Sequence, residues 1–149
     1  MRYVFLERIS RTLMATTENE MKLRLANVQQ VYNKITLKKG HGSSSRGGGQ
    51  GGFYWHIHYQ SKRRGCAFIN LVDREPFGTH PSMQVFVNKK DQNMGIGREA
   101  FKQGCELSGY PVVYAYTAKK NAASIKAACA AGFAILSNKP QVILKWVKK

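Results

Sequence analysis

Apolar and polar residues alternate in short blocks along this chain, and most blocks predict one strand or one helix. Tyr3–Leu6 is a run of β-forming residues and predicts a first strand. Residues 18–35 predict an amphipathic helix, because Thr17 and Glu20 form a capping pattern ahead of apolar residues at helical spacing. Those apolar residues are Met21, Leu25, Val28, Tyr32 and Ile35.

The middle of the chain predicts a β-hairpin. Phe53–Tyr59 alternates in polarity, and Cys66–Leu71 is a second apolar run after the basic turn Gln60–Gly65. One face of the first strand carries Trp55, Ile57 and Tyr59, and the other carries Tyr54, His56 and His58. Asp73–Pro81 contains two prolines and a glycine, which predicts a break in regular structure.

The second half of the chain predicts strands and helices in turn. The expected strands are Val85–Val87, Pro111–Thr117, Ala134–Leu136 and Gln141–Val147, and the expected helices are Gly97–Ser108 and Asn121–Ala131. Phe101, Gly104 and Cys105 should face inward on the first helix, and Ile125, Ala128 and Cys129 on the second. This order predicts an α/β or α+β fold with a mixed sheet, in one domain over residues 1–149.

A glycine- and serine-rich segment, residues 40–52, interrupts these blocks. Its composition offers no apolar area to bury, so we expect a flexible loop. It is either a slack surface loop or a mobile flap that carries Arg46 to an anionic substrate.

Charge adds a preference for anionic partners. The 24 Lys and Arg residues outnumber 8 Asp and Glu, for a net charge of +16. Such a field favours nucleic acid, with Lys62, Arg63, Arg64 and Arg46 as candidate contacts, or serves an anionic cofactor alone. Three widely spaced cysteines indicate a reducing compartment, and no apolar run is long enough for a membrane span, so we expect a cytoplasmic protein.

The segment Gln92–Gly97, QNMGIG, predicts a phosphate site. A strand precedes it and a helix follows it, so backbone N–H groups and the positive end of the helix dipole point at one place. Gly95–Ala100 also fits a dinucleotide fingerprint. That fingerprint needs an acidic residue at the end of the next strand, but residues 116–120 contain none. This absence argues against NAD.

Two motifs in this half of the chain resemble those of the GNAT superfamily of N-acetyltransferases. QNMGIG is similar to the acyl-CoA motif of that family, and Asn121–Ile125 with Gly132-Phe133 is similar to its second motif. The resemblance implies a mostly antiparallel sheet of about six to seven strands flanked by helices. It also implies a V-shaped splay between strands 85–87 and 112–117, where acetyl-CoA or another acyl-CoA meets an acceptor amine.

The resemblance also implies which residues hold the acyl-CoA. The strand end would bind the pantetheine arm, the loop would bind the pyrophosphate, and the second helix would contact the arm from the other side. The residues in these roles are Phe86, Val87, Gln92, Asn93, Met94, Gly95, Ile96, Gly97, Arg98, Asn121 and Ser124.

The chain departs from the family where proton transfer is expected. Ala128 stands where the family usually has a tyrosine, and no acidic residue lies on the strand before the loop. Tyr116, Ser124 and His58 are candidate catalytic residues in their place. His56 and His58 lack a third ligand at recognisable spacing, so we expect no metal site.

These observations predict an acyl-CoA-dependent N-acyltransferase whose acceptor amine lies on tRNA or DNA. Two alternatives remain: the same chemistry on a small-molecule or protein amine, and a nucleic-acid-binding or DNA-modifying protein of the same fold. The chain could be a monomer or a homodimer, since Gln141–Val147 is an apolar strand that could pair with a second copy.

Overall fold

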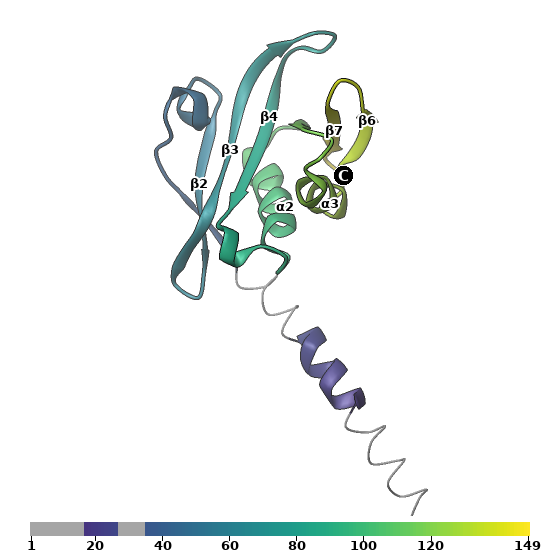
Figure 1. Ribbon diagram of the computed structural model, residues 1–149. Helices are drawn as coiled ribbons and strands as arrows, with labels where there is room; N and C mark the ends of the chain where they lie inside the picture. The colour runs from purple at the N-terminus through teal and green to yellow at the C-terminus, as the bar shows by residue number, and fades with distance from the viewer. Residues whose placement is uncertain (1–16, 27–34) are drawn as a thin grey trace, which may run out of the picture.

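The computed structural model describes residues 17–26 and 35–149, and its centre is a mixed sheet of seven strands (Figure 1). The spatial order is β1-β2-β3-β4-β5-β7-β6. Neighbouring strands are antiparallel except β4 and β5, which are parallel. The strands are β1 (Thr36–Lys39), β2 (Phe53–Tyr59), β3 (Lys62–Arg74), β4 (Gly78–Val87), β5 (Val112–Thr117), β6 (Ala134–Ser137) and β7 (Val142–Val147). The predicted fold class is confirmed.

One face of the sheet is covered by α2 (Ile96–Ser108) and α3 (Ala122–Ala130), which contact each other (Figure 1). Gly104 lets α2 approach the sheet closely, since a Cβ there would collide with the Met83 side chain. Alternate residues of the strands fill this core, among them Trp55 and Ile57, as predicted. Gly109, at a φ of 75°, ends α2 as expected.

The sheet splays open between β4 and β5. A single pair, Ser82 with Tyr114, joins these strands, whereas β3 and β4 are paired from Gly65 and Val87 to Arg74 and Gly78. The predicted V-shaped gap therefore opens beyond Ser82 and Tyr114, towards the ends of both strands.

The β3–β4 hairpin is much longer than the sequence indicated. Asp73–Pro81 was predicted to break regular structure, but only residues 75–77 lie outside the strands. Pro81 is tolerated because β5 pairs with β4 at Ser82 alone, so the first half of β4 is an edge on that side. The end of this hairpin and the β6–β7 turn lie at the same end of the molecule (Figure 1). A hydrogen bond joins them, because Arg74 Nη2 donates to Gln141 Oε1 at 2.9 Å.

The glycine-rich segment makes defined contacts with the sheet that the sequence did not indicate, while the flexibility of residues 40–52 stays a prediction. It folds into a compact turn (η1, Ser44–Gly48) against the face of the sheet opposite α2. Gly47 N donates to Asn70 Oδ1 at 2.7 Å, and Asn70 Nδ2 donates to Ser45 O at 2.8 Å. Tyr110 Oη donates to Gly51 O at 2.6 Å. Glycine serves here for close backbone approach, which composition alone does not distinguish from slack.

We expect Gly47→Ala to lower stability by about 1–3 kcal/mol, because the position has a φ of 80° and an added Cβ would collide with the Phe53 carbonyl oxygen. Gly49→Ala is the matched control, since its nearest atom would be Ser44 O at an ordinary 3.6 Å. Urea unfolding of both variants tests this. Equal loss in both variants would mean that the segment is not packed.

Two helix predictions are only partly met. Residues 17–26 are helical, but Met21 and Leu25 are 59% and 67% exposed, because no described element covers them. The predicted strand Tyr3–Leu6 and residues 27–34 of the predicted helix lie outside the described residues. On α3, Ala128 is buried as predicted, but Cys129 is exposed because it lies on the side of the helix away from the sheet.

Candidate active site

The loop after β4 presents backbone N–H groups at the start of α2. A short turn (η2, Lys89–Asp91) follows β4, and Asn93 and Gly95 then take left-handed backbone conformations, with φ of 64° and 84°. No side chain of the described residues caps α2, so its first N–H groups point out of the helix without a cap. With the positive end of the helix dipole, this arrangement suits a phosphate.

The side chains of the QNMGIG segment mainly hold this loop in place. Gln92 Nε2 donates to Val87 O at 3.1 Å, which ties the loop to the end of β4. The Ile96 side chain is 1% exposed and anchors the start of α2 in the core. At Gly97 an added Cβ would lie 3.5 Å from Ala127 Cβ on α3. Ligand contacts from this segment would therefore come mainly from its backbone.

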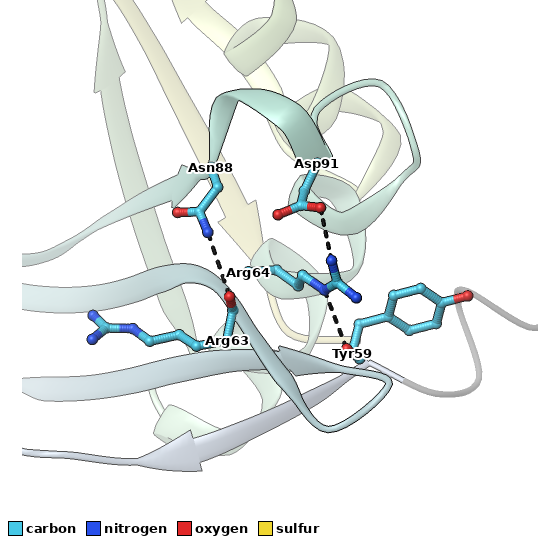
Figure 2. A network of polar contacts seen from close by, with 5 residues as sticks. All are labelled: Tyr59, Arg63, Arg64, Asn88 and Asp91. Carbon is cyan, nitrogen blue, oxygen red and sulfur yellow. Dashed lines mark hydrogen bonds and ion pairs between the residues drawn. The ribbon is translucent and has the colours of Figure 1, made fainter.

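An ion pair fixes the same loop to the β2–β3 hairpin (Figure 2). Arg64 Nη1 lies 3.0 Å from Asp91 Oδ1, and the two side chains are only 15% and 7% exposed. Arg64 Nε also donates to Tyr59 O at 3.2 Å, and Asn88 N donates to Arg64 O at 2.7 Å. The clamp of Arg64, Asp91 and Asn88 therefore holds both ends of the short turn after β4.

This clamp corrects the prediction of a basic hairpin tip. The turn consists of Gln60 and Ser61 alone, both at positive φ, so β3 begins at Lys62. Arg64 is engaged with Asp91, and Arg63 Nη2 donates to Tyr54 Oη at 3.0 Å. Arg46, on the glycine-rich turn, places its guanidinium 6.0 and 5.8 Å from the rings of Phe68 and Phe86. Nucleic-acid contact by Lys62, Arg63 and Arg46 stays a prediction.

A cavity of about 200 Å³ occupies the gap between β4 and β5. Its walls come from residues 83–86 of β4, residues 115–118 at the end of β5, and one side of α3. Ala128, where the family usually has a tyrosine, lies in this wall, as do Asn121 and Ser124. The predicted strand end and second motif thus share one cleft, to which α2 contributes Phe101.

Tyr116 also lines this cleft, and its hydroxyl is bonded to a buried histidine. His80 Nε2 lies 2.7 Å from Tyr116 Oη, and His80 Nδ1 lies 2.7 Å from Gly78 O. Because a carbonyl oxygen can only accept, Nδ1 carries the proton, and in the neutral ring Nε2 accepts the Tyr116 hydroxyl proton. Burial raises the pKa of Tyr116, although the Arg74 guanidinium, 4.1 Å from its ring centre, opposes that shift.

The other candidate residues are placed less favourably for chemistry. Asn121 Oδ1 accepts from Ser124 N at 3.2 Å, so Asn121 caps α3 while lining the cleft. His58 is on β2, with β3 between it and β4, and it does not line the cleft. Burial, Lys38 and Arg63 lower its pKa. In the part of the chain that the structure describes, no group of three metal-ligating side chains forms.

Two functional features were missed in the sequence. His80 went unnoticed because the prolines around it predicted a break, although His80, Ser82, Gln84 and Phe86 alternate as one strand face. The Arg64–Asp91 pair joins residues 27 positions apart, and no local pattern signals it.

A family model described as an acetyltransferase (GNAT) domain matches residues 8–134. No curated protein matches the sequence. Among solved structures, the aminoglycoside acetyltransferase AAC(6′)-Ib with ribostamycin and coenzyme A is similar at a TM-score of 0.58 and 13% identity, covering 66% of this chain and 65% of that one. The microcin C7 self-immunity acetyltransferase MccE with acetyl-CoA and AMP has a TM-score of 0.56 and 18% identity, covering 66% and 62%.

A GNAT family acetyltransferase from Elizabethkingia anophelis with acetyl-CoA bound covers 77% of this chain and 99% of its own, at a TM-score of 0.57 and 15% identity. The chain spans slightly less than two thirds of the length of AAC(6′)-Ib and MccE. At these identities the structures show a shared fold. None of the described helices has the length and apolar character needed to cross a membrane.

Proposed function

This chain belongs to the GNAT family of acetyltransferases, and from that premise we propose that it transfers an acetyl group from acetyl-CoA to an amine of a small molecule or a protein. One observation carries the proposal: Phe86 and Ala128 line the β4–β5 cleft, and the residues next to them in the chain lie close to the uncapped first turn of α2. A Cβ added at Gly97 in that turn would be 3.8 Å from Val87 and 3.5 Å from Ala127. A phosphate group at that helix and a thioester in the cleft would belong to one extended ligand.

Acetyl-CoA supplies an activated acyl thioester when it is bound. The backbone of residues 93–98 would hold the pyrophosphate, and Phe86 and Val87, with Asn121 and Ser124 opposite, would flank the pantetheine arm. Exposed Lys89 and Lys90 add positive charge at the loop. The uncapped N–H groups fit a phosphate ligand. The left-handed backbone of Gly95 shapes this loop, and a residue with a side chain would be strained there.

Tyr116 and His80 would manage the proton of the attacking amine. Attack of the amine nitrogen on the thioester carbonyl carbon would break the carbon–sulfur bond and release CoA as the thiolate, so one amine proton would need an acceptor. The amine proton passes to Tyr116 Oη as the hydroxyl proton moves to His80 Nε2. His80 would then return a proton through Tyr116 Oη to the thiolate. This pair fills the role for which the sequence offered no acidic residue.

A small-molecule or protein amine is supported better than a nucleic acid. The similar structures include an aminoglycoside acetyltransferase and MccE, whose bound ligands are small molecules. Within this chain, Arg64 belongs to the loop clamp and not to a free basic tip. The nucleic-acid reading therefore keeps only the overall charge and the exposed Arg46, Lys62 and Arg63 in its favour.

We expect CoA to raise the melting temperature of the protein, and acetyl-CoA to be consumed with a panel of primary amines. Gly95→Ala should raise the Kd for CoA about tenfold, because it strains the loop at a φ of 84° and disturbs the N–H groups aimed at the phosphate.

Gly109→Ala is the matched control, because it also has a left-handed backbone, at a φ of 75°, but lies at the other end of α2. It should change stability without changing CoA affinity. The proposed function is wrong if saturating CoA gives no thermal shift and no amine consumes acetyl-CoA.

A further inference from the structure

A second, larger cavity lies next to the acetyl-CoA cleft. Its volume is about 570 Å³, and it lies between the end of the β3–β4 hairpin and the β6–β7 turn. Tyr116 lines both cavities, so the two spaces meet at the residue that we place at the proton transfer. The size is in the range of small-molecule sites.

The walls of this second cavity are mostly flat or apolar. Phe77 from the hairpin and Tyr116 from β5 supply aromatic rings, and Leu136 and Ile143 supply aliphatic surface. The Phe77 ring is fixed, because it packs against Tyr114 with ring centres 4.6 Å apart. Leu136 is 48% exposed, so part of this apolar surface has no cover within the described chain. Such walls suit a planar, unsaturated group.

The charge at this cavity is mainly positive and partly fixed. Arg74 lies with its guanidinium carbon 4.1 Å from the centre of the Tyr116 ring, and its Nη2 donates to Gln141 Oε1 at 2.9 Å. These contacts hold a cation at the wall without neutralising it. Lys139 lies on the opposite turn, and Glu75 is the single acidic residue of the lining. An anionic group would therefore be favoured over a polycation.

We infer that this cavity binds the body of the acceptor, and that the acceptor is an amine whose structure includes a planar aromatic ring and an anionic group. The inference rests on the proposed function. The ring would lie against Phe77 and Tyr116, the carboxylate or phosphate would face Arg74 and Lys139, and the amine would point to Tyr116 Oη in the cleft.

Matched amine pairs test this inference through the release of the CoA thiol. Phenylalanine and phosphotyramine carry a carboxylate and a phosphate, phenethylamine and tyramine are the same amines without that anion, and kanamycin is a polycation. We expect kcat/KM at least about tenfold higher for the anionic member of each pair, with kanamycin the poorest acceptor. The carboxylate and phosphate arms show which anion is preferred. A higher kcat/KM for the members without the anion, or for kanamycin, would overturn the inference.

Arg74→Gln and Lys139→Gln should each raise KM for the amines that carry an anion at least about fivefold, and leave KM for the amines without the anion unchanged. Both residues are exposed, so the variants should fold. Lys62→Gln is the control, because Lys62 is exposed at the start of β3 and does not line the second cavity. It should leave KM unchanged for both kinds of amine. Equal KM values in all three variants would contradict the inference.

Binding separates this inference from the proposed function. Ligand-observed NMR with AMP and adenosine, which need not be acetylated, should show AMP binding that Arg74→Gln weakens. If CoA binds and acetyl is transferred but Arg74 has no effect on anionic amines or AMP, only the acceptor site is wrong. If CoA gives no thermal shift and no amine is acetylated, the proposed function fails, and this inference with it.

Discussion

Tyr116→Phe should lower kcat for acetyl transfer by about 10²–10³-fold and leave the Kd for CoA within about twofold. The hydroxyl is the group that joins the cleft to His80, at 2.7 Å from Nε2. Removing it leaves the amine proton without an acceptor at that point, while the ring still fills its place between the two cavities. Steady-state kinetics and CoA titration measure the two effects separately.

The pH profile adds a second readout for the same residue. Burial raises the pKa of Tyr116, so its hydroxyl stays protonated through the neutral range and can donate to His80 Nε2. As pH rises through that raised pKa, the hydroxyl ionises and no longer has a proton to pass to His80, so the wild-type rate should fall on the alkaline side. The residual activity of Tyr116→Phe should lack that dependence.

Tyr114→Phe is the matched control for the loss of a hydroxyl. Tyr114 lies on the same face of β5, and its ring packs against Phe77 and His80, but it does not line the cleft. Its kcat should stay within about threefold of the wild type. Equal losses in the two variants would remove Tyr116 from the reaction and leave it a packing role.

Arg64→Met should destabilise the protein by about 3 kcal/mol, because it leaves the Asp91 carboxylate buried without its partner. Asp91 Oδ2 already has no hydrogen-bond partner among the described residues, so the carboxylate has no alternative nearby. The same variant should raise the Kd for CoA, because the turn after β4 loses its attachment to the hairpin. Chemical unfolding and CoA titration test both parts.

The double variant Arg64→Met with Asp91→Asn should recover most of the lost stability, since no uncompensated charge remains. Arg63→Met is the control, because Arg63 is exposed and makes a hydrogen bond to the neutral Tyr54 hydroxyl, so its loss leaves no buried charge unpaired. It should cost less than about 1 kcal/mol. A loss as small in Arg64→Met would show that the ion pair does not hold the loop.

Local patterns were sufficient for the elements that build the β4–β5 cleft. The glycines of QNMGIG, the Asn121 motif, the alternation of β2 and the apolar run of β5 are all short-range signals, and the family motifs added their order. What failed was judged by composition. Glycine in residues 40–52 and proline in residues 73–81 usually mark irregular chain. Here Gly47 in the first segment bonds to Asn70, and residues 78–81 of the second pair with β3.

The remaining features depend on contacts between distant residues. Arg64 meets Asp91, and His80 meets Tyr116, only because the β3–β4 hairpin is long and adjoins β5. Neither partner carries a signal in its own neighbourhood. The second cavity has the same origin, since Arg74 and Gln141 are 67 residues apart.

The single Ser82–Tyr114 pair has a consequence for how the protein unfolds. It divides the sheet into two half-sheets, β1–β4 and β5–β7, each with its own full ladder of hydrogen bonds. The cooperativity of unfolding between the two half-sheets therefore depends on the helices and on the ligand that fills the β4–β5 cleft. A pantetheine chain lying there would act as an eighth strand, so part of the binding free energy would appear as coupling between two folding units.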